Sequence, residues 1–234
     1  MREEDLDEIL NRSADEPHNV KPEVLIRISD SVKASLRPVR TLPSRRVLTG
    51  AVMLACAAVS IMGAARSGFF GFAKMDSLER WLVFCLLGIL AWAASDSYVR
   101  AMVPGSRRHL SGAALVGWTC VALLGVFALL FRDYATHNFF SAGITCLVVG
   151  LVHAVPAALL SWLLLRRGFA VDAVTAGLAA GVLGGIAGLG MLELHCPNFQ
   201  AAHVLVWHTA VLPASGALGA GIGWLLSLRR ARNR

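Results

Sequence analysis

Residues 171–192 read VDAVTAGLAAGVLGGIAGLGML, an apolar run with a single charged residue near its start. At 1.5 Å per residue, a helix of this length crosses the hydrocarbon core of a bilayer, which is about 30 Å thick. Gly177, Gly181 and Gly185 recur in it at every fourth position and so lie on one face of a helix. Small residues at this spacing let a second helix backbone approach closely. The run therefore predicts a membrane-spanning helix that packs tightly against a neighbour.

Apolar runs of similar length on either side of this one predict six transmembrane helices in all, joined by short connections. The expected spans are Val47–Ala65, Leu78–Ala101, Gly112–Phe131, Phe140–Leu165, Val171–Leu192 and His203–Leu228. The last span repeats the small-residue spacing with Ser215, Gly219 and Gly223. We expect the fifth and sixth spans to pair within one subunit; the alternative is a homodimer built on the same glycines.

The composition agrees with an all-α integral membrane bundle. The chain has 234 residues, of which 56% are hydrophobic and 16% charged, and its mean hydropathy is +0.61. A soluble domain of this size needs more polar surface to cover its core. The net charge of +7 does not indicate nucleic-acid binding, because the Arg residues stand beside the apolar runs and form no separate basic face.

These Arg residues instead predict the orientation in the membrane, since cytoplasmic loops are enriched in Lys and Arg. With the N-terminus inside, most basic residues near the spans fall on the cytoplasmic side, and only Arg66, Lys74, Arg80 and Arg132 fall outside. We therefore expect a multi-pass protein of the bacterial inner membrane with both termini in the cytoplasm. The expected parts are a cytoplasmic segment (1–46), a six-helix domain (47–228) and a basic tail (229–234).

The cytoplasmic segment contains an amphipathic helix over about residues 22–36. Its apolar residues recur at three- to four-residue spacing and form one stripe: Val24, Leu25, Ile28, Val32 and Leu36. A segment this short cannot bury such a stripe by itself, so the stripe needs a partner surface. That surface is either the bilayer together with the cytoplasmic loops, or a groove on another protein.

Polar chemistry gathers at the outer ends of the last three spans, where ionisable groups are costly and often functional. Three interpretations remain open for these residues. Cys146 and Cys196 could form a disulfide or react with an oxidant or a metal. His195, Cys196, His203 and His208 could bind a soft or borderline metal ion, although their spacing matches no established metal motif. The same groups could also be ordinary interfacial residues.

No sequence signature of an enzyme accompanies these residues. There is no nucleotide-binding loop, no nucleophile elbow and no pair of carboxylates, and Asp96 and Asp172 lie near cytoplasmic ends. We therefore expect a protein that is not an enzyme and has no cofactor other than the metal ion considered above. A small membrane transporter, or a metal- or redox-binding membrane protein, is the alternative to a regulator.

Several stretches together resemble the NrsF family, polytopic anti-sigma factors named as negative regulators of sigma-F. The stretches are SLRPVRTLPS at 35–44, Cys146, Pro156, Arg166-Arg167, the glycine-rich fifth span, Leu194-His-Cys-Pro197 and Val206-Trp207-His208. The resemblance covers most of the chain from about residue 32 onward. His208 departs from it, because the family has Tyr after this Trp, and the acidic first 30 residues are longer than usual.

The resemblance implies a regulator of transcription in a stress response. Such a protein would sequester an extracytoplasmic-function sigma factor at the inner membrane and release it on an envelope redox or metal signal. The implied sensors are Cys146 and Cys196, and the implied partner-binding surface is the stripe in the N-terminal segment. The departure at His208 favours a site that is tuned by a metal ion.

Overall fold

The computed structural model describes residues 21–35, 43–103, 111–165 and 172–232. They fall into two units, one up to Thr41 and one from Leu42, which are described separately.

The first unit contains one described helix, α2 (Pro22–Ser35). Proline suits the first position of a helix, because its missing N–H has no partner there in any case. The apolar stripe is exposed in this unit at Val24, Leu25, Ile28 and Val32. Leu36, the last residue assigned to the stripe, lies outside the described residues.

The described part of the second unit has six helices that are long and apolar enough to span a membrane, as the sequence predicts. They are α3 (Arg45–Ser67), α5 (Ser77–Met102), α6 (Gly112–Leu130), α7 (Phe139–Leu165), α8 (Ala173–His195) and a composite helix over Ala201–Arg232. A short helix, α4 (Phe70–Lys74), follows α3. The described residues form no strand, only one isolated bridge between Asp133 and Gln200. The all-α class is therefore confirmed.

The composite sixth helix has three parts. It begins as α9 (Ala201–His203), continues as the π-helical segment η1 (Val204–His208) and ends as α10 (Thr209–Arg232). The sequence predicts one apolar span over His203–Leu228, and that pattern does not reveal the π-helical segment.

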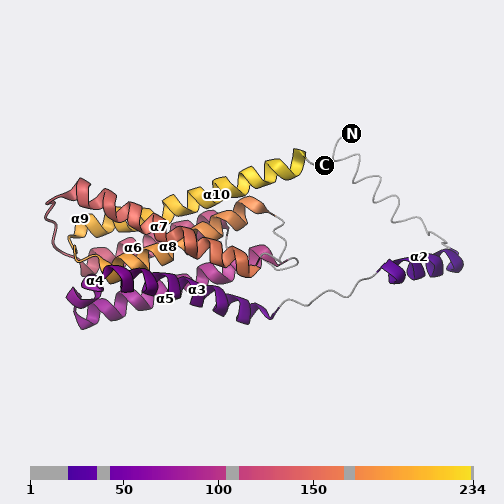
Figure 1. Ribbon diagram of the computed structural model, residues 1–234, viewed down its shortest axis with the longest axis horizontal. Helices are drawn as coiled ribbons and strands as arrows, with labels where there is room; N and C mark the ends of the chain where they lie inside the picture. The colour runs from indigo at the N-terminus through magenta and orange to yellow at the C-terminus, as the bar shows by residue number, and fades with distance from the viewer. Residues whose placement is uncertain (1–20, 36–42, 104–110, 166–171, 233–234) are drawn as a thin grey trace. The chain divides into compact units, whose positions relative to one another are not determined.

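Helix α8 forms the centre of the bundle, where it packs against α10, α7, α3 and α5 (Figure 1). From Gly181 to Glu193 every residue of α8 is buried. Most spans expose apolar side chains on their outer surface, as lipid-facing helices do. Helix α8 has no such surface along this stretch, because neighbouring helices cover it on all sides.

Glycines allow these close contacts. A Cβ atom added at Gly177 would collide with the carbonyl oxygen of Gly219 in α10, and one at Gly181 would collide with that of Ser215. Gly185 meets the Ser215 side chain, and Gly223 meets the carbonyl oxygen of Ala173. The structure thus places the glycines of the fifth and sixth spans against each other within one subunit.

A second row of glycines in α8 packs against another neighbour, helix α7. A Cβ atom at Gly188 would collide with the carbonyl oxygen of Gly150 in α7, and one at Gly184 would come within 2.6 Å of that of Ala154. Backbone therefore meets backbone on two faces of α8, and no flexible side chain separates the three helices.

We predict that Gly219→Ala destabilises the bundle whereas Gly221→Ala, two residues away in the same helix, does not. The added methyl group at residue 219 meets backbone, while nothing lies within 4 Å of the corresponding position at Gly221. Overpacking of this kind costs about 1–3 kcal/mol. Thermal unfolding of the two variants in the same detergent measures the difference, and equal midpoints would contradict the packing described here.

Candidate functional site

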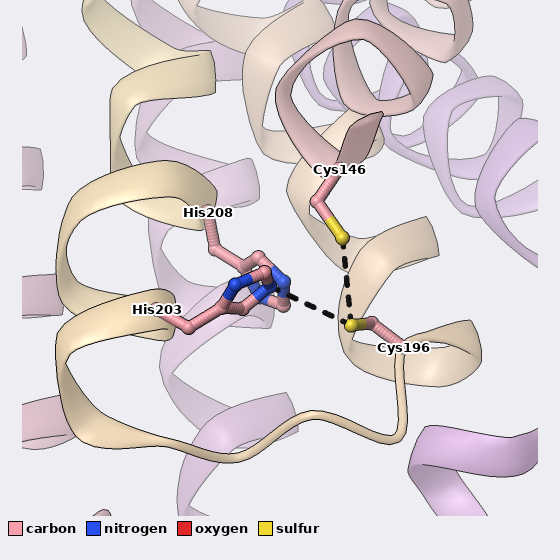
Figure 2. A group of neighbouring side chains, drawn as sticks. All are labelled: Cys146, Cys196, His203 and His208. Carbon is pink, nitrogen blue, oxygen red and sulfur yellow. Dashed lines mark hydrogen bonds between the residues drawn. The ribbon is translucent and has the colours of Figure 1, made fainter. Parts of the chain in front are cut away.

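Four side chains that can bind metals meet at one end of the bundle (Figure 2). Cys146 belongs to α7, Cys196 caps the C-terminus of α8, His203 ends α9 and His208 ends η1. The ligand atoms of all four lie within 4.8 Å of one another. We call these four residues the thiol–imidazole cluster.

The two thiols are close neighbours although 50 positions separate them in the sequence. The Sγ atoms of Cys146 and Cys196 lie 3.5 Å apart, and the Sγ atom of Cys196 lies 3.8 Å from Nε2 of His203. Both thiols are free. Cys196 is buried and Cys146 is half-buried, so the protein itself encloses most of the cluster.

The π-helical segment brings the two histidines together. Residues five apart in an α-helix point about 140° away from each other, because five residues turn the chain through about 500°. In a π-helix the hydrogen bonds run from i to i+5, so residues at this spacing lie nearly above one another. The rings of His203 and His208 accordingly stack edge to face, with centroids 5.0 Å apart.

Glu193 is a third buried ionisable group beside the cluster. Nδ1 of His208 donates a hydrogen bond of 2.7 Å to Oε1 of Glu193, and both side chains are fully buried. This bond directs Nδ1 toward the carboxylate and leaves Nε2 directed away from it. Within the described chain, Nε2 of His208, Nδ1 of His203 and Oε2 of Glu193 have no hydrogen-bond partner. Buried polar atoms without partners are rare, so three of them beside one cluster call for an explanation.

The environment of Cys196 favours its thiolate form. The hydrogen bond from the Cys146 thiol lowers the pKa of Cys196, and the imidazoles of His203 and His208 act in the same direction, against the opposing effect of burial. The thiolate is the nucleophilic and metal-binding form of cysteine. Of the two thiols, Cys196 is therefore the one whose thiolate its neighbours stabilise.

The connection between α8 and α9 covers the cluster and is anchored on both sides. Nζ of Lys74 donates a hydrogen bond of 2.9 Å to the carbonyl oxygen of Pro197. The ring of Phe199 stacks on that of Phe131, with centroids 5.1 Å apart and planes inclined by 6°. At Gly71 of α4, the backbone approaches the carbonyl oxygen of Cys196 so closely that an added Cβ atom would lie 2.7 Å from it.

The structure does not place every predicted metal ligand in the cluster. His195 lies outside it, because its Nδ1 atom is 3.0 Å from the carbonyl oxygen of Gly68 and its ring contacts Phe70. Cys146, which the sequence analysis assigned to the thiol pair and not to the four-residue metal set, lies inside it. Helix α8 continues one turn beyond the expected end at Leu192, and this extension turns His195 and Cys196 in different directions.

Sequence reasoning assigned no role to Glu193. The available signal was a carboxylate at the end of an apolar run, since ionisable residues in membrane helices are rare and are usually paired. Its partner, fifteen positions away, could not be identified from spacing alone.

The fold and the cluster define a class: an α-helical protein with six helices long and apolar enough to span a membrane, a largely buried thiol–imidazole cluster and an amphipathic helix near the N-terminus. The family model NrsF, negative regulator of sigma F, matches residues 33–229. The chain belongs to this family, so the resemblance seen in the sequence is confirmed, and a sigma factor is its expected type of partner. No curated protein and no solved structure matches the chain.

We predict that Glu193→Ala strongly destabilises the protein, because it leaves His208 buried without its partner. Removing one member of a buried pair costs about 3–5 kcal/mol, whereas replacing both members by apolar residues is often neutral. The double variant Glu193→Leu with His208→Leu should therefore recover much of the loss. Thermal unfolding in detergent measures both effects. If Glu193→Ala unfolded at the same midpoint temperature as wild type, the pair would not be stabilising.

Proposed function

We propose that this protein is an anti-sigma factor that holds an extracytoplasmic-function sigma factor at the bacterial inner membrane and releases it when Cys146 and Cys196 are oxidised. The observation that carries the proposal is the 3.5 Å contact between these two Sγ atoms in a protein of the NrsF family. The two ends of the mechanism, partner binding and sensing, have separate structural support.

Partner binding is assigned to α2. Four large apolar side chains of its stripe are between 45% and 56% exposed: Val24, Leu25, Ile28 and Val32. An exposed apolar stripe on a helix is suited to a hydrophobic groove on another protein, where its anchors recur every three to four residues. Family membership supports a sigma factor as the protein that supplies such a groove.

The orientation with both termini in the cytoplasm follows from the positive-inside rule. Arg45 at the start of α3, Arg100 near the end of α5 and Arg229 near the end of α10 belong to the same end of an antiparallel bundle. There Arg45 forms an ion pair with Asp96 at 3.3 Å. The thiol–imidazole cluster follows the opposite ends of the spans and therefore faces the oxidising compartment, where disulfides form and persist.

Oxidation of the pair requires a two-electron oxidant such as hydrogen peroxide. The Cys196 thiolate attacks one peroxide oxygen, the O–O bond breaks, and the released hydroxide takes up a proton to become water, which leaves a sulfenic acid. The Cys146 thiol then attacks this sulfur, and a second water leaves as the S–S bond forms. Two thiols and one peroxide thus give one disulfide and two waters.

The glycine contacts provide a route for transmission to the cytoplasmic end. A disulfide joins α7 to the C-terminus of α8 and draws the two sulfur atoms from 3.5 Å to about 2.05 Å. Helices α7, α8 and α10 touch through backbone atoms at Gly188 and Gly181, so side chains cannot absorb the shift there. The displacement passes along the helices toward the N-terminal segment and frees the sigma factor.

We predict that Ile28→Asp abolishes co-purification of the sigma factor, whereas Ile26→Asp does not. Both side chains are exposed, and the same charge is introduced, but the two positions point about 160° apart on the helix. Loss of a central apolar anchor weakens binding by about tenfold or more. The assay is capture of each co-expressed sigma factor from the same genome on the tagged full chain. The assignment would be refuted if the Ile28→Asp variant still retained the sigma factor. It would also be refuted if the wild-type protein retained no sigma factor.

We predict that hydrogen peroxide releases the captured sigma factor from wild type but not from Cys146→Ser or Cys196→Ser. The matched control is Cys85→Ser, which removes an exposed free thiol outside the cluster and should leave release unchanged. Peptide mass spectrometry should detect a disulfide between residues 146 and 196 in the oxidised protein. Release that persists in both cluster variants would show that the thiols are not the sensor.

A further inference from the structure

We infer that Cys146, Cys196, His203 and His208 form a four-coordinate binding site for one Zn²⁺ ion in the reduced protein. The inference rests on the proposed function only in that the same two thiols serve as the sensor. It adds a bound Zn²⁺ ion to the site. The zinc-bound form is then a second state of the two thiols, which competes with the disulfide.

The distances in the cluster match the edges of a zinc tetrahedron. With Zn–S bonds near 2.3 Å and Zn–N bonds near 2.05 Å, a tetrahedral centre separates two sulfur ligands by about 3.8 Å and a sulfur from a nitrogen by about 3.6 Å. The two Sγ atoms lie 3.5 Å apart, and Sγ of Cys196 lies 3.8 Å from Nε2 of His203. All four ligand atoms lie within 4.8 Å of one another, so small side-chain rotations complete the coordination.

An unpartnered buried atom points to the same ligand. His208 is fully buried, and its Nε2 atom has no hydrogen-bond partner in the described chain, although its Nδ1 atom is bound to Glu193. A carboxylate that holds one nitrogen of a histidine while the other faces a metal is the usual outer shell of zinc sites. Glu193 thus fixes the ring and increases the basicity of the ligating nitrogen.

The donor set selects the type of ion. Two thiolates and two imidazoles suit borderline and soft cations and exclude Mg²⁺ and Ca²⁺, which prefer oxygen ligands. A closed set of four protein ligands is typical of structural or regulatory zinc, whereas catalytic zinc keeps one position open. Three of the four ligands, Cys196, His203 and His208, are buried, which agrees with the closed type.

Zinc binding and disulfide formation exclude each other, since both use the same two sulfur atoms. Oxidation of the loaded site by one hydrogen peroxide and two protons yields the disulfide, two waters and free Zn²⁺. Both electrons come from the thiolates, and the metal does not change its oxidation state. Bound zinc therefore holds α7, α8 and the sixth helix together in the reduced arrangement, and an oxidant that converts the thiolates to a disulfide releases it.

The test uses the purified full chain in detergent, reduced and freed of metal by a chelator. Equilibrium dialysis against Zn²⁺ should give one ion per chain, and Co²⁺ should give the thiolate charge-transfer band and the intense visible bands of tetrahedral cobalt. His208→Gln and Cys146→Ser should lose the stoichiometric ion and this spectrum. Glu193→Gln should weaken Zn²⁺ binding by about 10–100-fold.

The matched control is His195→Gln, which changes the histidine next to Cys196 that lies outside the cluster and should retain one ion. Wild-type protein that binds no Zn²⁺, that binds Cu⁺ but not Zn²⁺, or that gives octahedral cobalt bands would overturn the proposal. So would equal zinc loss in His195→Gln and His208→Gln. The cobalt spectrum of wild type decides the matter even if a variant fails to fold.

Capture of the sigma factor in the same preparations separates the two proposals. Reduced wild type that retains the sigma factor and releases it on oxidation, yet binds no Zn²⁺, refutes only the zinc site. Wild type that binds Zn²⁺ in the tetrahedral form but retains no sigma factor refutes only the proposed function.

Discussion

Direct contact between helix backbones along α8 is the constraint on which the rest of the bundle depends. Lipid gives helices no hydrophobic reason to associate, so membrane bundles are held by close packing and by hydrogen bonds between helices. In α8 the glycine rows make that packing possible on two faces, toward α10 at Gly181 and toward α7 at Gly188. The same contacts hold α8 against α7, and so keep Cys196 at the end of α8 close to Cys146 in α7. The proposed sensing by this thiol pair requires such a rigid frame, because the two sulfur atoms must stay within reach of each other.

The six spans were predictable because length and hydropathy alone determine them, and the structure has a long apolar helix in each of the six expected regions. Glycine spacing also indicated the pairing of the fifth and sixth spans, since few other reasons place small residues at every fourth position.

The ends of the spans were predicted less accurately. Helix α8 runs to His195 rather than Leu192, because no proline or polar cluster interrupts it before Pro197. Whether the termini face the cytoplasm remains a prediction from charge.

The site was only partly predictable, and the reason is helical periodicity. The sequence shows which residues can bind a metal, but a 3.6-residue repeat places His203 and His208 on different faces. Their meeting depends on the π-helical segment Val204–His208, which no propensity scale detects. The pairing of Glu193 with His208 depends on the same segment, because it sets the direction of the His208 ring. His195, next to Cys196 in the sequence, was assigned to the site by proximity, yet its side chain reaches the carbonyl oxygen of Gly68 instead.

The π-helical segment also has an evolutionary consequence. A π-turn holds one residue more than an α-turn, so a single-residue insertion into an ordinary transmembrane helix is enough to create one, and a single deletion abolishes it. The two imidazoles of this protein lie five residues apart, and the π-helical turn absorbs the extra residue so that the rings converge. In a homologue with one residue fewer between the histidines, an ordinary α-helix would give the same convergence, because residues four apart already lie on one face. Helix type and chain length between the two histidines must therefore change together if the thiol–imidazole cluster is to be kept.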